Sequence, residues 1–251
     1  VVAIELKNQH TGQSVDDAMR QWEYNRNPKE YAFGFNKRVL AYFACDLYNV
    51  YMTTQLNGAE TVFLPFNQGS NGAGKDGGAG NPTTEDGKYV TSYFWENVLQ
   101  KDKLLDILQK FISYERSEKK KIMPDGSTKT TVSSKVIFPR YHQLDVVRKL
   151  VSHVRENGAG HNYLIQHSAG SGKSNSIAWT AYRMASLHDE NNNPIFDSVI
   201  IVTDRRVLDQ QLQATVSGFD HTLGSVVTID EKKNSGDLRD CLLYTSDAAD
   251  E

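Results

Sequence analysis

The stretch Tyr163-Leu-Ile-Gln-His167-Ser-Ala-Gly170-Ser-Gly-Lys-Ser174 decides the fold of the second half of the chain. Its first four residues predict a short strand over 163–166, and the apolar spacing after the glycines predicts a helix over about 173–186. The turn between them matches the phosphate-binding pattern G-x-x-x-x-G-K-[ST], except that His167 takes the place of the first glycine. A strand, a glycine loop and a helix in this order are the context in which the pattern binds phosphate.

Each residue type in this loop has a chemical reason. Glycines at positions 170 and 172 let backbone N–H groups approach phosphate oxygens without a Cβ clash. Lys173 neutralises the β- and γ-phosphates, and the Ser174 hydroxyl is a candidate Mg²⁺ ligand. The candidate ATP-binding residues of the loop are therefore Ala169, Gly170, Ser171, Gly172, Lys173 and Ser174.

With His167 in the first position, the segment 167–174 resembles the first motif of superfamily 2 motor ATPases, which does not require a glycine at that position. Such motors often carry an upstream glutamine that reads adenine, and Gln143 lies 30 residues before Lys173. An amide donates and accepts at once, which suits adenine, although a surface glutamine near a helix start is the alternative. The apolar run over 198–203 predicts a buried parallel strand, with another helix from about Val207. The following residues, Thr203 to Arg206, resemble motif Ia of these motors or are a solvated charged turn.

A second segment, Gly69-Ser-Asn-Gly-Ala-Gly-Lys75-Asp76, also fits G-x-x-x-x-G-K. It lacks the serine or threonine, because Asp76 stands there and repels phosphate, and no helix is predicted after it. We interpret residues 67–82, which are rich in glycine, as a loop without a nucleotide role.

The N-terminal segment, residues 1–8, places a carboxylate and an ammonium group on one strand face. Alternation over residues 1–8 predicts a strand on which Glu5 and Lys7 share a side. An acid that binds Mg²⁺ beside a lysine that activates water is the arrangement of PD-(D/E)xK nucleases, whereas a solvated salt bridge is the simpler alternative. A helix predicted from Ser14 to about Asn25, with Asp17 as a capping-box partner, adds Gln21 and Tyr24.

Other elements are predicted from local patterns. Two strand-like runs form a hairpin over 39–54, another strand covers 61–66, and helices begin near Phe94 and near Pro139. Residues 115–130 are charged and contain a Pro-Asp-Gly turn, so we place a linker or hairpin there.

Composition limits the function classes. The 251 residues have a mass of 28.2 kDa, a net charge of −3 and 39% hydrophobic residues, which is typical of globular protein. No run of 18 apolar residues exists, so no membrane partner is expected. Two cysteines are too few for a disulfide framework and favour a reducing compartment, the cytoplasm.

Both ends suggest an internal fragment of a longer protein. The chain starts within a predicted strand, without Met. Residues 241–251 resemble the translation of a sequencing adapter, so we expect native sequence to end near Asp240.

The ordered series of motifs resembles the restriction subunit of type I restriction–modification enzymes over residues 1–240. The motifs are Val2-Ala-Ile-Glu-Leu-Lys-Asn8, Phe63-Leu-Pro-Phe-Asn67, Gly78-Ala-Gly-Asn-Pro82, Tyr93-Phe-Trp95, Leu104-Leu-Asp-Ile-Leu108, Pro139-Arg-Tyr-His-Gln143 and the phosphate loop.

The resemblance implies an α/β chain with two domains. Residues 1–114 would be the C-terminal part of a PD-(D/E)xK nuclease domain, 115–135 a linker or hairpin, and 136–240 the N-terminal part of the first RecA-like motor domain. It also implies ATP-dependent translocation and endonucleolytic cleavage of double-stranded DNA, with ATP and Mg²⁺ as cofactors. Separate modification and specificity subunits are the implied partners, and the fragment itself is expected to be inactive.

The resemblance also assigns roles to residues. Glu5, Lys7, Gln21 and Tyr24 become nuclease residues, with Glu5 as a metal ligand, and Gln143 becomes the adenine reader. The family has Q-x-x-x-Y where this chain has Q-x-x-Y, so the assignment of Gln21 is firmer than that of Tyr24. Two alternatives stay open: a stand-alone superfamily 2 helicase with an accessory domain, and a non-catalytic ATP-binding scaffold.

Overall fold

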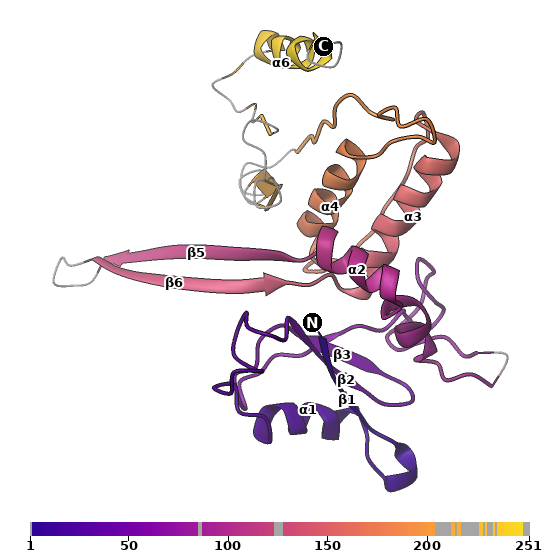
Figure 1. Cartoon of the computed structure of the whole chain (residues 1–251), viewed down its shortest axis with the longest axis vertical. Helices are drawn as coiled ribbons and strands as arrows, with labels where there is room; N and C mark the ends of the chain where they lie inside the picture. The colour runs from indigo at the N-terminus through magenta and orange to yellow at the C-terminus, as the bar shows by residue number, and fades with distance from the viewer. Residues whose placement is uncertain are drawn as a thin grey trace. The chain divides into compact units, whose positions relative to one another are not determined.

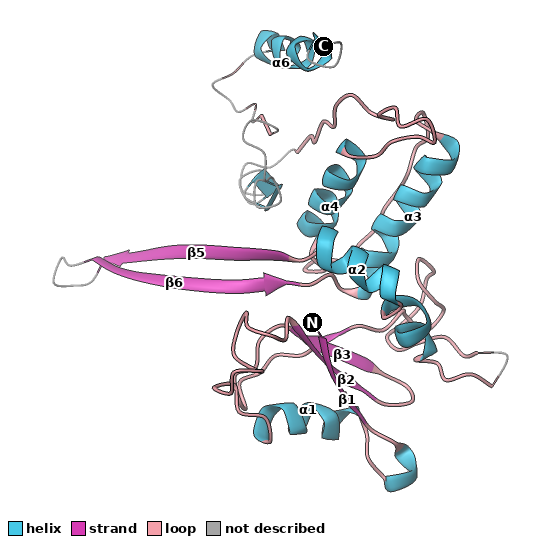
Figure 2. Cartoon of the chain, in the orientation of Figure 1, coloured by secondary structure: helices cyan, strands magenta, loops and turns pink. Residues whose placement is uncertain are grey.

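The computed structural model describes residues 2–84, 87–122, 128–203, 212–213, 215–216, 226–227, 229, 233 and 235–247. The chain divides into two compact units, Val1–His142 and Gln143–Glu251. Figure 1 shows the course of the chain, and Figure 2 shows that helices and strands both contribute, so the fold is α/β.

The first unit is built on a mixed four-stranded sheet in the order β1-β2-β3-β4. Its strands are β1 (Val2–Leu6), β2 (Ala41–Cys45), β3 (Val50–Thr53) and β4 (Leu64–Pro65). β1 pairs parallel to β2, whereas the β2–β3 and β3–β4 pairs are antiparallel. The predicted hairpin over 39–54 is thereby confirmed, and the predicted strand over 61–66 is reduced to two residues.

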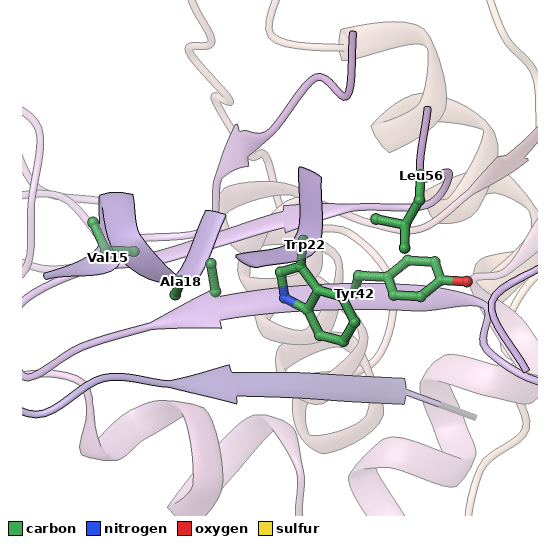
Figure 3. Close-up of a cluster of buried hydrophobic side chains, with 6 residues drawn as sticks. Val15, Ala18, Trp22, Tyr42 and Leu56 are labelled. Atoms are coloured by element: carbon green, nitrogen blue, oxygen red, sulfur yellow. The ribbon is translucent and has the colours of Figure 1, made fainter. Parts of the chain in front are cut away.

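Helix α1 (Val15–Tyr24) covers one face of this sheet. Its buried residues Val15, Ala18 and Trp22 recur at helical spacing and pack with Tyr42 of β2, as Figure 3 shows. The Trp22 indole N–H donates to the Phe43 carbonyl at 3.0 Å, which fixes the helix against the strand. The predicted helix is confirmed, and the Asp17 carboxylate accepts the Ser14 backbone N–H at 2.8 Å, as a capping box requires.

The buried carboxylate of Asp46 joins the helix to the β2–β3 turn. One oxygen accepts the Val15 N–H at 2.9 Å, and the other accepts the N–H groups of Tyr48 and Asn49 at 2.8 and 2.7 Å. Three backbone donors therefore converge on one side chain. Because charge-assisted hydrogen bonds are the stronger kind, Asp46 sets where α1 begins relative to the sheet.

The opposite face of the sheet carries an aromatic core. The Phe43 ring lies 4.7 Å from that of Phe94 and 5.7 Å from that of Phe138, centroid to centroid. Phe94 belongs to a π-helical turn, η2 (Phe94–Val98). The sequence predicts one helix from Phe94 onward. The structure breaks it at Gln100, whose extended backbone (ψ 141°) precedes α2 (Lys101–Lys110).

The charged segment after α2 is a hairpin. β5 (Ser113–Ile122) pairs antiparallel with β6 (Thr128–Ile137) over ten residue pairs. This hairpin is a sheet separate from the four-stranded one. The hairpin belongs to the first unit.

Helices dominate the described part of the second unit. They are α3 (Tyr141–Asn157), which begins at the boundary, α4 (Lys173–Ala185) and α6 (Ser235–Asp247). The predicted helices near 139–154 and 173–186 are confirmed. Among the described helices, none has both the length and the apolar character needed to cross a membrane.

The two strands predicted for this unit are not formed. Residues 163–166 and 198–203 have no strand assignment, and Leu164 and Val202 are 94% and 88% exposed. A strand exists only where its backbone groups bond to a neighbouring strand, and an apolar run cannot supply that neighbour by itself. The prediction of a parallel sheet over these segments was wrong for the described residues.

Candidate functional site

A cluster of three polar side chains forms where β1 meets α1. Lys7 Nζ donates to Glu5 Oε1 at 3.2 Å and to Gln21 Oε1 at 2.5 Å. The side chains of Lys7 and Glu5 are 9% and 16% exposed. The structure thus brings Gln21 next to Glu5 and Lys7, which lie 16 and 14 positions before it in the sequence.

The polar side of β1 is its covered side. Ala3, which shares that side with Glu5 and Lys7, packs against the α1 core, whereas Ile4 and Leu6 on the other side are 36% and 66% exposed. A solvated salt bridge would show the opposite pattern, because charged pairs without a special role stay in water. The arrangement therefore favours a built site over a solvated face.

Tyr24 lies outside this cluster, since its side chain at the end of α1 is 70% exposed. Arg26, which the sequence analysis did not single out, belongs to it. The Arg26 Nη2 atom donates to Glu5 Oε2 at 3.3 Å. The signal that could have found it is the spacing from Trp22 to Arg26, four residues apart, which suits a cation over an aromatic ring.

The donors fit a Mg²⁺ site that uses one protein carboxylate. Mg²⁺ commonly keeps several waters and binds one or two carboxylates together with substrate phosphates. Glu5 offers one such carboxylate beside the ammonium of Lys7. No group of three or more His, Cys, Asp or Glu residues suited to a metal occurs among the described residues.

The glycine loop of the second unit contains two glycines in the left-handed conformation. Gly170 and Gly172 have φ angles of +72° and +83°, and Gly172 caps the start of α4. The Lys173 ammonium donates to the carbonyl oxygens of Ser168 at 2.9 Å and His167 at 3.3 Å. Lys173 therefore lies over the loop at the helix N-terminus, where the helix dipole favours an anion.

The other predicted loop residues lie in the turn and at the start of α4. Ala169 lies in the turn, Ser171 is buried, and Ser174 lies half-buried in the first turn of α4. Burial, together with the charge of Lys173, lowers the pKa of His167 below its ordinary value. The imidazole is therefore neutral at pH 7 and adds no charge to the loop.

Gln143 contacts the loop directly. Its Nε2 donates to the Gly172 carbonyl at 2.8 Å, and its side chain belongs to the first turn of α3. A Cβ added at Gly172 would lie 2.5 Å from this Nε2. The predicted adenine reader and the phosphate loop thus share one hydrogen bond.

Gly172→Ala should therefore destabilise the protein more than Gly170→Ala does. Both substitutions put a Cβ on a left-handed residue, which costs about 1–2 kcal/mol. Position 170 has no other atom within 4 Å, whereas position 172 meets Gln143. Loss of the Gln143 bond adds about 1 kcal/mol at position 172.

Thermal unfolding of the two variants measures this difference. A double variant that adds Gln143→Ala should remove the clash and bring Gly172→Ala closer to Gly170→Ala. Equal unfolding temperatures for Gly172→Ala and Gly170→Ala would show that the Gln143 contact does not form.

The second glycine segment, Gly69–Asp76, differs from the loop before α4. The Gly69 N–H donates to the Gly80 carbonyl oxygen at 2.8 Å and closes this loop, and no helix begins directly after Lys75, since residues 76–84 are not helical. It has no helix N-terminus with which to bind phosphate. The predicted motif Ia residues from Asp204 to Arg206 lie outside the described residues.

Residues 142–248 match the family model described as SWI2/SNF2 ATPase. The matched range contains Gln143, the glycine loop and α4. The match points to a superfamily 2 helicase-like ATPase that uses ATP, and it supports ATP-dependent helicase- or translocase-like activity. No curated protein and no solved structure matches the chain.

Proposed function

We propose that the chain is part of the restriction subunit of a type I restriction–modification enzyme, in which an ATP-driven motor on double-stranded DNA is joined to an endonuclease. The observation that carries the nuclease half is the position of Lys7 Nζ between Glu5 and Gln21. The motor half rests on the SWI2/SNF2 ATPase match and on the geometry of the glycine loop.

In the nuclease half, each of the three side chains has a task. The Glu5 carboxylate would hold Mg²⁺, which supplies an activated water and neutralises phosphate charge. The Lys7 ammonium neutralises the charge that develops on the scissile phosphate, where a preorganised cation is most effective. Gln21 accepts a hydrogen bond from Lys7 and so keeps the ammonium pointing at the site.

In the motor half, the loop residues bind the nucleotide. Backbone N–H groups around Gly170 and Gly172 face the phosphates, and Lys173 leaves its carbonyl partners to neutralise them. Ser174 would hold the Mg²⁺ of the nucleotide, and Gln143 would read adenine with its amide. Separate modification and specificity subunits would complete the complex in the cytoplasm.

The test is Glu5→Gln in the full-length protein, with DNA cleavage and ATP hydrolysis measured on one preparation. The amide keeps the shape of Glu5 but is a poor Mg²⁺ ligand, so cleavage should fall about 100-fold or more while ATP hydrolysis is retained. Glu30→Gln, an exposed carboxylate after α1, is the matched control and should leave both activities unchanged.

Three outcomes separate the candidate functions. Selective loss of cleavage supports the restriction subunit. A wild-type protein that hydrolyses ATP with DNA but never cleaves it would be a helicase with an accessory domain. A protein that binds ATP and shows neither activity would be a scaffold.

A further inference from the structure

Each oxygen of the Glu5 carboxylate has its own cationic partner. Oε1 accepts from Lys7 at 3.2 Å, and Oε2 accepts from Arg26 at 3.3 Å. One carboxylate and two cations leave this group with a formal charge of +1. A divalent cation that binds Glu5 adds positive charge to a group that is already cationic, so its binding is favoured when one of the two partners moves away.

Lys7 is the more firmly held of the two. Its side chain is 9% exposed, and it has a second acceptor in Gln21. A buried ammonium that leaves its carboxylate loses a partner it cannot replace with water, which makes its departure costly.

Arg26 is the more easily displaced partner. Its side chain is 35% exposed, so water can solvate the guanidinium when the ion pair opens. Its guanidinium carbon lies 5.9 Å from the ring centroid of Trp22, which is itself fixed by the bond to Phe43. This ring gives the guanidinium a defined resting place beside the site whether or not it contacts Glu5.

We propose that Arg26 is a positioning residue of the nuclease site: its guanidinium pairs with Glu5 Oε2 until a divalent cation binds, and the ion pair then opens so that this oxygen can bind the metal. This proposal rests on the proposed nuclease function. It makes Arg26 a counter-ion that keeps the carboxylate in place but weakens metal binding, because the metal has to compete with an existing ion pair.

The experiment is Mn²⁺ binding to the full-length protein, followed by the loss of the free Mn²⁺ electron paramagnetic resonance signal. Arg26→Gln should bind Mn²⁺ about two- to fivefold more tightly than wild type, the range expected for removing a partly exposed ion pair. Arg26→Met, which keeps an aliphatic stem over Trp22, should show the same gain. Arg20→Gln removes one positive charge from an exposed position on α1 and should change binding little.

The outcomes separate this proposal from the proposed function. If Glu5→Gln leaves Mn²⁺ binding and DNA cleavage unchanged, the nuclease assignment is wrong. If Glu5→Gln removes Mn²⁺ binding, but both Arg26 variants bind like wild type or more weakly, the nuclease assignment stands and the role of Arg26 is overturned. A gain in Arg20→Gln as large as in Arg26→Gln would also overturn it, because the effect would then be one of net charge.

Discussion

Lys173→Ala is expected to lower ATP turnover about 100- to 1,000-fold, the loss that follows removal of one preorganised group that stabilises transition-state charge. The ammonium lies over the loop on the Ser168 and His167 carbonyls, at the N-terminus of α4, where the phosphates would bind. Under the proposed function, cleavage depends on translocation and should be lost as well. ATP hydrolysis and plasmid cleavage by the full-length protein measure both effects.

Lys75→Ala provides the matched control for this experiment. Lys75 ends the second G-x-x-x-x-G-K segment and is exposed, and the residues directly after it, 76–84, are not helical. Its removal should leave ATP turnover unchanged. If Lys173→Ala still translocates along DNA, then Lys173 is not the phosphate lysine and the loop has another use.

Lys7→Ala is expected to lower DNA cleavage by about 100-fold or more while DNA-stimulated ATP hydrolysis continues. The reason is that Lys7 and Lys173 lie in different compact units, and the Lys7 ammonium donates to Glu5 and Gln21, which both belong to the first unit. Cleavage and ATP hydrolysis are assayed together, so a damaged preparation would lose both activities.

A second variant at position 7 separates loss of the ammonium from loss of the folded state. Lys7→Met keeps most of the aliphatic stem and removes the charge together with the hydrogen bonds to Glu5 and Gln21. It should cleave as poorly as Lys7→Ala and unfold at a higher temperature. Normal cleavage by Lys7→Met would mean that the ammonium has no part in the reaction.

Local sequence predicts the elements around the cluster of Glu5, Lys7 and Gln21 well. The residues Val15, Ala18 and Trp22 repeat at helical spacing behind Ser14 and Asp17, and α1 forms there. The side-chain period of a strand predicts that Glu5 and Lys7 share a face, which the 3.2 Å contact confirms. Their chemical roles remain predictions.

Features that depend on distant partners are harder to predict. Arg26 reaches Glu5 only because the chain turns after α1 and the long side chain folds back over Trp22. The apolar runs at 163–166 and 198–203 have the composition of strands. A strand also needs a neighbouring strand for its backbone hydrogen bonds, and composition does not show whether one is present. The Gln143–Gly172 hydrogen bond likewise joins residues 29 positions apart.

The role of Asp46 matters for anyone who maps this protein by mutational screening. Its carboxylate holds the first N–H of α1, and Gln21 lies six residues further on, about 9 Å along the helix axis. A shift of the helix start would swing Gln21 away from Lys7 without altering any residue of the cluster. A screen scored on activity alone would therefore group Asp46 with the residues of the cluster, although Asp46 acts by anchoring the helix that carries Gln21.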